Sequence, residues 1–345
     1  MEKTHKIVTY NVLRMSQKFL IIFLGYFLYG CCSPKETVVF FESFPKSDSL
    51  KSEKVEWIDN YKVEDIKIVD SLLILVDSKN KKYIYVYNLT NHKLISSLGR
   101  KGKGPEEFVR APLLSNYCGS NEDFILPIFD QTKRILYKLK MSNDGFFLSN
   151  EVKLPKDLYP ADWTYFGNGN ICSTDSNCFY SYNYISKNYF RKRSPDVTKQ
   201  KLNENELATV NYMHLQVAQD GNVIVGTYAA LQRFNIYNGK GDLKISVANN
   251  IVPRFNPSDG YFWEKNKSFY FRSILTKNYI LIINEDRFLR EMNNSKLLVF
   301  DYSGKAIAEY NLDCIIRNGV YDQNAHRLYA FDLSNYRTVF FELPL

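Results

Sequence analysis

The chain has 345 residues and a formal net charge of +8, and 15% of its residues are aromatic, including 26 tyrosines. Abundant aromatic residues favour β-strands over helical bundles, and the length suits one large all-β domain in a chain without a linker-like segment. The positive charge is spread thinly along the sequence, so we expect no nucleic-acid partner.

Residues 1–30 are expected to be a signal peptide. The segment Phe19–Leu28 is continuously apolar and follows the basic residue Lys18. As a helix, this segment would span about 15 Å, half of a bilayer core of about 30 Å. These features are typical of a secretory signal and not of a transmembrane anchor. Met15 is an alternative start, because residues 1–14 add little that an export signal needs.

The residues Leu28-Tyr29-Gly30-Cys31 resemble a bacterial lipobox, with an apolar residue at −3 and a small residue at −1. The resemblance implies cleavage before Cys31 and lipidation of that cysteine. Each buried CH₂ of an acyl chain adds about 0.8 kcal/mol to membrane binding, so several chains would hold the protein there. The alternative is a plain secretory signal. Residues 31–36 are expected to be a tether, and residues 37–345 the globular domain.

The clearest strand pattern lies between Leu72 and Phe108. Polar turns separate three apolar runs, Leu72–Val76, Tyr83–Tyr87 and Leu94–Leu98. Runs of this length are too short for helices, and three in succession predict an antiparallel meander. We interpret this stretch as one blade of a β-propeller.

The same pattern recurs at intervals of roughly 40–60 residues, which is typical of a repeat architecture. About 290 residues at roughly 40–45 per four-stranded blade give six to seven blades, and we predict an all-β, six-bladed propeller. A β-sandwich of two jelly-roll halves is the alternative. The polar residues 194–211 are expected to form a loop or one short surface helix. The predicted blades are Val63–Leu98, Glu122–Leu154, Trp163–Lys192, Met213–Val252, Phe271–Leu312 and Cys314–Leu343.

The last predicted blade shows only three clear strands. The strand candidate Thr37–Phe44 precedes the first blade and has no partner in the sequence pattern. An unpaired edge strand is a liability, and joining the two ends of the chain in one blade removes it. We therefore expect Thr37–Phe44 to supply the fourth strand of the last blade.

The segment Gly99–Phe108 resembles the G-x-x-G-x-G-P-x-E-F signature of the TolB-like, six-bladed β-propeller lipoproteins of Bacteroides-type bacteria. The resemblance implies the same fold, export and lipid anchoring, and it carries no defined reaction. Two roles are open for the segment. Its cations could meet an anion above the propeller face, or Glu107 and Phe108 could lock a connecting loop to the next blade. The cations are Arg100, Lys101 and Lys103.

Motifs for catalysis and metal binding are absent from the sequence. The chain has no H-E-x-x-H zinc motif and no G-x-S-x-G nucleophile elbow, so we expect no catalytic residue, no metal and no cofactor. His92, His214 and His326 are isolated in the sequence. They are expected to be structural, although His214 and His326 could converge over the central channel because blades bring distant residues together.

Two further groups of residues have alternative roles. Trp163, Tyr165 and Trp263 belong to aromatic segments that could form a sugar-binding platform or pack between blades. Cys172 and Cys178 flank a turn, and they could form a disulfide in an exported protein or remain buried thiols. Acidic residues recur at strand ends, where we expect them to accept backbone hydrogen bonds in turns. These residues are Asp77, Asp130, Asp301 and Asp332.

The sequence favours a lipid-anchored protein of the cell envelope that binds or scaffolds without catalysis. The expected location is the outer membrane, on either its periplasmic or its surface face. The expected partners are the membrane, through the anchor, and a protein or glycan at the propeller face. The candidate binding residues are Arg100, Lys101, Lys103, Trp163, Tyr165, Trp263, His214 and His326. The alternative is a carbohydrate-active envelope enzyme with its site at the mouth of the channel.

Overall fold

The computed structural model describes residues 37–59, 61–104, 107–115, 124–156, 163–175, 178–193, 197–251, 254–256, 261–288 and 291–345. The chain divides into two units, Met1–Thr37 and Val38–Leu345, and the fold described below is that of the second. The predicted signal peptide, lipobox and tether at residues 1–36 lie outside the described residues. Within the described ranges, no helix has the length and apolar character needed to cross a membrane.

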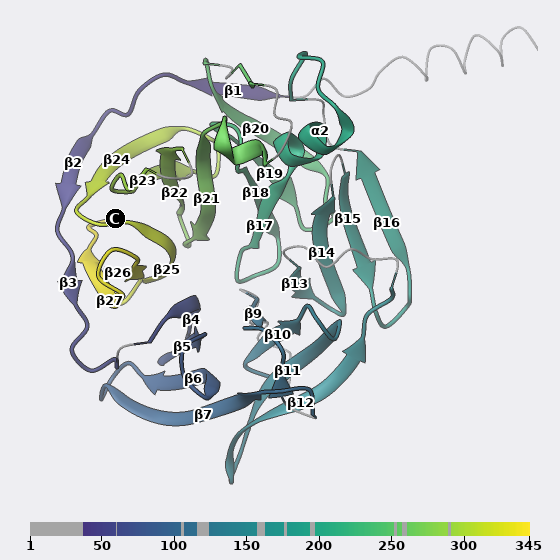
Figure 1. The fold of residues 1–345 in the computed structure, drawn as a ribbon, viewed down its shortest axis with the longest axis vertical. Helices are drawn as coiled ribbons and strands as arrows, with labels where there is room; N and C mark the ends of the chain where they lie inside the picture. The colour runs from purple at the N-terminus through teal and green to yellow at the C-terminus, as the bar shows by residue number, and fades with distance from the viewer. Residues whose placement is uncertain are drawn as a thin grey trace, which may run out of the picture. The chain divides into compact units, whose positions relative to one another are not determined.

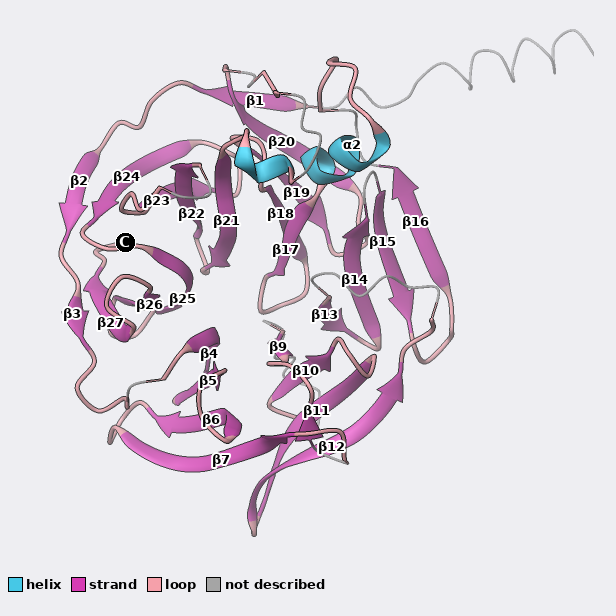
Figure 2. Cartoon of the chain, viewed as in Figure 1, coloured by secondary structure: helices cyan, strands magenta, loops and turns pink. Residues whose placement is uncertain are grey.

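The unit Val38–Leu345 is a six-bladed β-propeller (Figures 1 and 2). Six sheets stand in a ring, and each sheet contains an antiparallel meander of consecutive strands. Blade one contains β4 (Val63–Val69), β5 (Leu72–Asp77), β6 (Lys82–Asn88), β7 (Lys93–Lys101) and β8 (Glu107–Phe108). Blade two contains β9 (Leu113–Leu114), β10 (Leu126–Asp130), β11 (Ile135–Ser142) and β12 (Gly145–Lys153). Blade three contains β13 (Thr164–Gly167), β14 (Asn170–Asp175), β15 (Cys178–Asn183) and β16 (Tyr189–Arg193).

Blades four to six continue the ring and take additional strands from the N-terminal segment. A short helix, α2 (Glu204–Asn211), connects blades three and four, and a 3-10 turn, η1 (Phe262–Glu264), connects blades four and five. The meander of blade four consists of β17 (Met213–Val217), β18 (Val223–Tyr228), β19 (Arg233–Asn238) and β20 (Leu243–Asn249). That of blade five consists of β21 (Ser268–Leu275), β22 (Tyr279–Arg287), β23 (Lys296–Asp301) and β24 (Ala306–Leu312). That of blade six consists of β25 (Ile316–Asp322), β26 (Arg327–Asp332) and β27 (Arg337–Glu342).

The predicted meanders form because their middle strands are buried on both faces. In β5, Leu73 to Val76 are all fully buried, and their neighbours in the core come from the same blade and from the blades on either side, two and six. Blades in a ring stack face to face, so an apolar residue on either face of a central strand finds a partner. The predicted order of six blades is confirmed, and residues 197–211 contain the short helix that the sequence allowed, with Asn203 and Glu206 forming a capping box at its start.

The closure of the last blade differs from the sequence prediction. Strand β1 (Val38–Phe41), the core of the candidate Thr37–Phe44, pairs in parallel with β20 of blade four and not with blade six. The next strand, β2 (Ser47–Leu50), pairs in parallel with β24 of blade five. Only β3 (Glu53–Lys54) reaches the last blade, where it pairs antiparallel with β27.

The N-terminal segment is therefore a strap along the outer edges of blades four, five and six, as Figure 1 shows. Burial explains why β1 stops at blade four. Phe41 packs edge-on against Phe300 at 5.2 Å between ring centroids, within the apolar cluster that joins blades four and five. Both residues of β3 are exposed, so they suit the solvent-facing edge of the last blade.

The strap predicts a strong contrast between two adjacent phenylalanines. Phe41 is 8% exposed and Phe40 is 60% exposed. Truncating a buried phenylalanine removes transfer free energy and leaves a cavity, so F41A should lower the free energy of unfolding by about 3 kcal/mol. The exposed control, F40A, should change it by less than about 0.5 kcal/mol. Chemical denaturation of the two variants measures both values, and equal losses would show that the strap does not depend on this anchor.

Candidate functional site in the central channel

The innermost strand of each blade faces the centre of the ring. These strands are β4, β9, β13, β17, β21 and β25, and neighbouring members of the set contact each other around the channel. Side chains alternate between the two faces of a strand. Successive inner strands can therefore place polar side chains beside one another in the channel although they are far apart in sequence.

Asp65 of β4 is the centre of the polar network in the narrow section of the channel. Its side chain is 1% exposed and lies 3.4 Å from Arg272 Nη1 of blade five and 3.7 Å from Lys67 Nζ. Asn318 Nδ2 of blade six donates to the Asp65 carboxylate at 2.9 Å, and the backbone N–H of Leu114 in blade two also donates at 2.9 Å. One carboxylate thus joins four blades, and each of its oxygens accepts a hydrogen bond, as a buried charge requires.

His214 lines the same narrow section. Residues from β4, β9, β13, β17 and β21 surround a cavity of about 20 Å³, enough for one water molecule. His214 contributes one wall, together with Arg272 and Trp163, and its ring packs edge-on against Tyr212 at 5.0 Å. The section is too small for an organic ligand and works as the floor of the wider opening.

The wider opening lies at the end of the channel where the inner strands finish. It is a cavity of about 250 Å³ whose lining comes from blades one, two, four, five and six. We call it the mouth. Its polar groups are amides, hydroxyls, two carboxylates and the ammonium group of Lys67, and its apolar groups are aliphatic apart from the ring of Tyr321. The lining includes Lys67, Asp70, Ser115, Gln219, Ser273, Val320, Tyr321, Asp322, Gln323 and Asn324.

One hydroxyl in the mouth has no hydrogen-bond partner. Ser273 is 3% exposed, and its Oγ makes no hydrogen bond within the described protein. A buried polar group without a partner costs about 1–3 kcal/mol, so such groups are rare and are normally satisfied by water or by a ligand. By contrast, the carboxylate of Asp322 accepts the backbone N–H groups of Asn324 and Ala325 and holds a turn. Ser273 therefore leaves a buried hydrogen-bonding group without a partner beside the mouth.

The three described histidines lie in different settings. His92 stacks on Trp57 at 4.7 Å with an angle of 3° between the ring planes. His326 Nδ1 lies 3.2 Å from the hydroxyl of Tyr321 in the blade-six turn. Only His214 belongs to the lining of the channel, so the convergence of His214 and His326 that the sequence allowed does not occur.

The aromatic residues proposed as a sugar platform are packing residues. Trp163 is 3% exposed and Tyr165 is 1% exposed, and both belong to the core cluster of blades two and three. Trp263 packs edge-on against Phe262 at 5.1 Å and contacts a different cluster. Their burial agrees with the alternative that the sequence also allowed, packing between blades, and the three rings do not form the platform because they belong to separate clusters.

The segment Gly99–Phe108 locks blade one to blade two. Phe108 is fully buried and packs edge-on against Tyr137 of blade two at 5.4 Å. Glu107 Oε2 accepts the backbone N–H of Gly104 at 2.8 Å. Gly99 has a φ of +65°, and a Cβ there would lie 2.7 Å from the Phe108 ring, so both the backbone angle and the contact require glycine. The locking role that the sequence allowed is therefore present.

The structure places the aspartates in turns and the two cysteines too far apart for a disulfide. The acidic turn residues accept backbone N–H groups as predicted, for example Asp301 from Ser303 at 2.8 Å. Cys172 and Cys178 are both free. Cys172 faces Ser181 across the hairpin while Cys178 faces Asp175, and this offset is too long for a disulfide. Burial raises the pKa of the Cys172 thiol, which makes it unreactive.

Sequence reasoning missed Asp65, Lys67, Arg272 and Ser273. A signal was present for the first two, because an acid and a base two residues apart in a β-strand point to the same face. In the run Val63–Val69, the face that carries Asp65 and Lys67 is polar. A polar face distinguishes an inner strand from a central strand that is buried on both faces. Arg272 and Ser273 carry no such signal, because their role depends on the neighbouring blades.

The network around Asp65 predicts a strong effect on stability. D65N keeps the shape of the side chain but removes the negative charge that faces Arg272 and Lys67 in a buried site. Removing one partner of a buried ion pair costs about 3–5 kcal/mol, so the free energy of unfolding should fall by at least about 3 kcal/mol. The control D48N removes a carboxylate that is exposed on β2 and should cost less than about 1 kcal/mol. Thermal and denaturant unfolding measure both, and a neutral D65N would refute the role of the network.

Comparison with known proteins identifies relatives of this fold. Among solved structures, a protein of Bacteroides fragilis NCTC 9343 described as a "putative exported protein" superposes with a TM-score of 0.55 at 13% identity, covering 89% of this chain and 98% of its own. The β-propeller domain of Cps50 (Swd1) from Myceliophteria thermophila gives a TM-score of 0.49 at 10% identity, covering 85% of this chain and 100% of that domain. No curated protein sequence matches the chain.

A family model described as "TolB-like 6-blade propeller-like" matches residues 43–324. The match begins within the strap, ahead of β2, and ends in blade six, so it includes blades one to five and the first strand of blade six. Because it spans most of the sequence, this chain belongs to the TolB-like six-bladed propeller family.

Proposed function

We propose that this protein is a lipid-anchored binding protein of the cell envelope, and that it holds its ligand at the mouth of the propeller channel without catalysis. The mouth carries this proposal. It is a cavity of about 250 Å³ built from five blades, and the buried hydroxyl of Ser273 at its wall has no partner within the described protein. Concave sites with a few convergent polar groups on an apolar lining are the usual form of ligand pockets.

The lining indicates the kind of ligand. Amide side chains such as Gln219 and Asn324 both donate and accept hydrogen bonds, and the neighbouring Ile274 and Val320 offer an apolar surface. A sugar ring and a peptide side chain present this combination of hydroxyl or amide groups with C–H faces. The volume of about 250 Å³ lies just below the range of about 300–1,000 Å³ for ligand pockets. The mouth therefore suits the end of a glycan or the tip of a protein loop.

The alternative is a carbohydrate-active enzyme at the same mouth. Glycoside hydrolysis needs a general acid and a second carboxylate on either side of the bond. Asp70 and Asp322 are the two carboxylates of the mouth, and the turn uses Asp322 for two backbone hydrogen bonds. Each described histidine lies in a separate setting. These observations favour binding over catalysis.

The sequence and the family support the proposed location in the cell envelope. The lipobox-like residues 28–31 precede a body that belongs to the TolB-like family, and a protein of the same fold is described as a "putative exported protein". Lipidation at Cys31 would tether the propeller to a membrane through residues 31–36. The mouth would then meet ligands of the envelope.

Site-specific photo-crosslinking in cells tests the proposed mouth. Gln323 is exposed at the mouth, and Asn293 is exposed in the hairpin between β22 and β23, at the other end of its blade. A benzophenone amino acid placed at position 323 should capture a discrete envelope protein or glycan, while the same probe at position 293 should not. Adding Q219A to the position-323 variant should reduce capture at least about threefold, if a lost hydrogen bond costs about 1 kcal/mol. Equal capture at both positions, or none at position 323, would contradict binding at the mouth.

The anchor has a separate test with adjacent cysteines. C31S should abolish the lipid modification and release the protein from the membrane fraction, because a serine has no thiol for the acyl transfer. C32S is the matched control, and it should keep the modification. Mass spectrometry of the mature N-terminus and membrane fractionation measure both outcomes. Lipidation that survives in C31S and disappears in C32S would move the anchor by one residue, and an unmodified wild-type N-terminus would reject it.

A further inference from the structure

Blade one carries a second concave surface that the proposed function does not use. The turn between β5 and β6 and the end of β7 surround a cavity of about 410 Å³. Five of its six lining residues are cations, and the sixth is an amide. We call it the basic pocket, and it is lined by Lys79, Asn80, Lys81, Lys82, Arg100 and Lys101.

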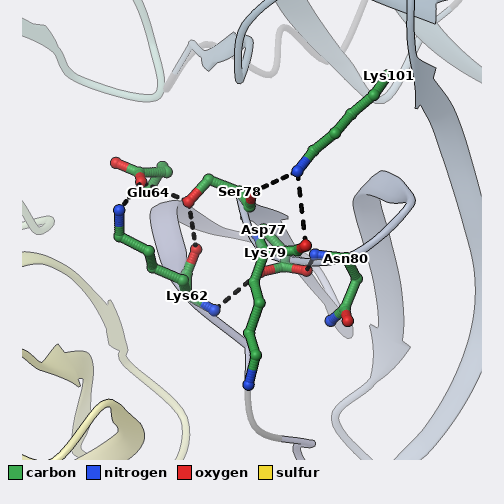
Figure 3. Close-up of polar contacts among 7 residues, drawn as sticks. All are labelled: Lys62, Glu64, Asp77, Ser78, Lys79, Asn80 and Lys101. Carbon is green, nitrogen blue, oxygen red and sulfur yellow. Dashed lines mark hydrogen bonds and ion pairs between the residues drawn. The ribbon is translucent and has the colours of Figure 1, made fainter.

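The turn that forms one wall is held in place by Asp77. This carboxylate is fully buried and accepts three backbone N–H groups, from Lys62 at 2.8 Å, Lys79 at 3.0 Å and Asn80 at 2.8 Å. Lys101 Nζ donates to the carbonyl of Ser78 at 2.6 Å and joins the end of β7 to the turn (Figure 3). The pocket is therefore preorganised by contacts that leave the remaining cations available.

The nearby acidic groups are occupied elsewhere. Glu64 accepts a hydrogen bond from Ser78 Oγ at 2.6 Å and lies 3.5 Å from Lys62 Nζ (Figure 3). Asp77 is used by the turn. Within the described ranges, no carboxylate forms an ion pair with any of four cations of the pocket. These cations are Lys79, Lys81, Lys82 and Arg100.

The pairing of β6 with β7 makes this arrangement unfavourable on its own. Lys82 and Arg100 are directly opposite each other in the antiparallel register, and Lys101 N donates to the Lys81 carbonyl on the adjacent rung. Like charges directly opposite on neighbouring strands are destabilising. Lys82 and Arg100 therefore repel each other, and an anion between them would relieve this repulsion.

We propose that the basic pocket binds the phosphate groups of a polyanionic ligand. Arginine offers a planar pair of N–H donors that matches phosphate, and lysine ammonium groups act as point charges beside it. The pocket differs from the mouth in chemistry and in place. Asp70 of the mouth and Lys79 of the basic pocket lie beyond opposite ends of β5, a strand of about 20 Å.

The sequence indicated part of this pocket. Arg100, Lys101 and Lys103 were candidates for an anion site in the segment Gly99–Phe108. The structure uses Lys101 to brace the turn, leaves Lys103 exposed and outside the lining, and adds the three lysines of the β5–β6 turn. Phosphate could be supplied by a lipid headgroup or by a soluble phosphorylated molecule, and the two sources share this chemistry.

Binding of inorganic tripolyphosphate to the full chain in neutral detergent tests the proposal. Isothermal titration at low ionic strength should give saturable binding to the wild type. The triple variant K79Q/K81Q/R100Q should weaken it at least tenfold. The control K51Q/K240Q/K277Q removes the same charge from three exposed lysines, one directly after β2, one in blade four and one in blade five. It should change the dissociation constant less than twofold. Tripolyphosphate should also raise the melting temperature of the wild type and of the control, but not that of the pocket variant.

A second arm distinguishes the sources of phosphate. Dihexanoyl phosphatidylglycerol, monomeric in solution, should compete with tripolyphosphate if a headgroup is the ligand, and dihexanoyl phosphatidylcholine should not. Competition by neither lipid would assign the pocket to a multiply phosphorylated soluble ligand. Absence of tripolyphosphate binding to the wild type, or equal weakening in the pocket and control variants, would overturn the proposal, because the second result reports only total charge.

Discussion

Closure of the ring is the constraint on which the rest of the structure depends. A blade whose central strands are apolar on both faces needs a neighbour on each side, and six blades satisfy this need only when the last packs against the first. Strand β25 lies beside β4 at this junction, and β3 completes the outer edge of the last blade before the chain enters blade one. The carboxylate of Asp65 adds a polar tie at the centre by joining four blades.

The blades could be predicted from the sequence because their evidence is local. Apolar runs of four to six residues, with Asp or Asn and Gly at the turns, predict strands and hairpins without reference to the rest of the chain. The inner strand of blade two was missed, since β9 is only Leu113–Leu114 and a pair of residues has no periodicity. The route of the strap was also not predictable. Val38–Phe41 fits any edge with an apolar groove beneath it, and the groove exists only after blades four and five have packed.

The candidate sites were harder to predict than the fold, because they too depend on contacts between distant parts of the chain. Trp163 and His214 have chemistry that is visible in the sequence, but whether a side chain on an inner strand faces the channel or the next blade depends on the register of sheets far apart in the chain. Ser273 illustrates the limit, because a single serine in a strand has no distinguishing pattern. Its importance comes from being buried at the mouth without a hydrogen-bond partner. The family signature at Gly99–Phe108 correctly indicated the fold, and its residues prove to be mainly structural.

The two concave surfaces of blade one follow from one feature of an antiparallel sheet. Turns at alternate ends of the strands emerge on opposite faces of a propeller, so β5 leads from the turn at Asp70 to the turn at Lys79. Selection on one turn leaves the other free to vary, since each is a separate loop on a rigid support. The mouth draws on five blades and offers amides, hydroxyls and charges of both signs, whereas the basic pocket draws on a single blade and offers mainly positive charge. The two proposed ligands would therefore bind at opposite ends of the blade, where binding of one leaves the other site accessible.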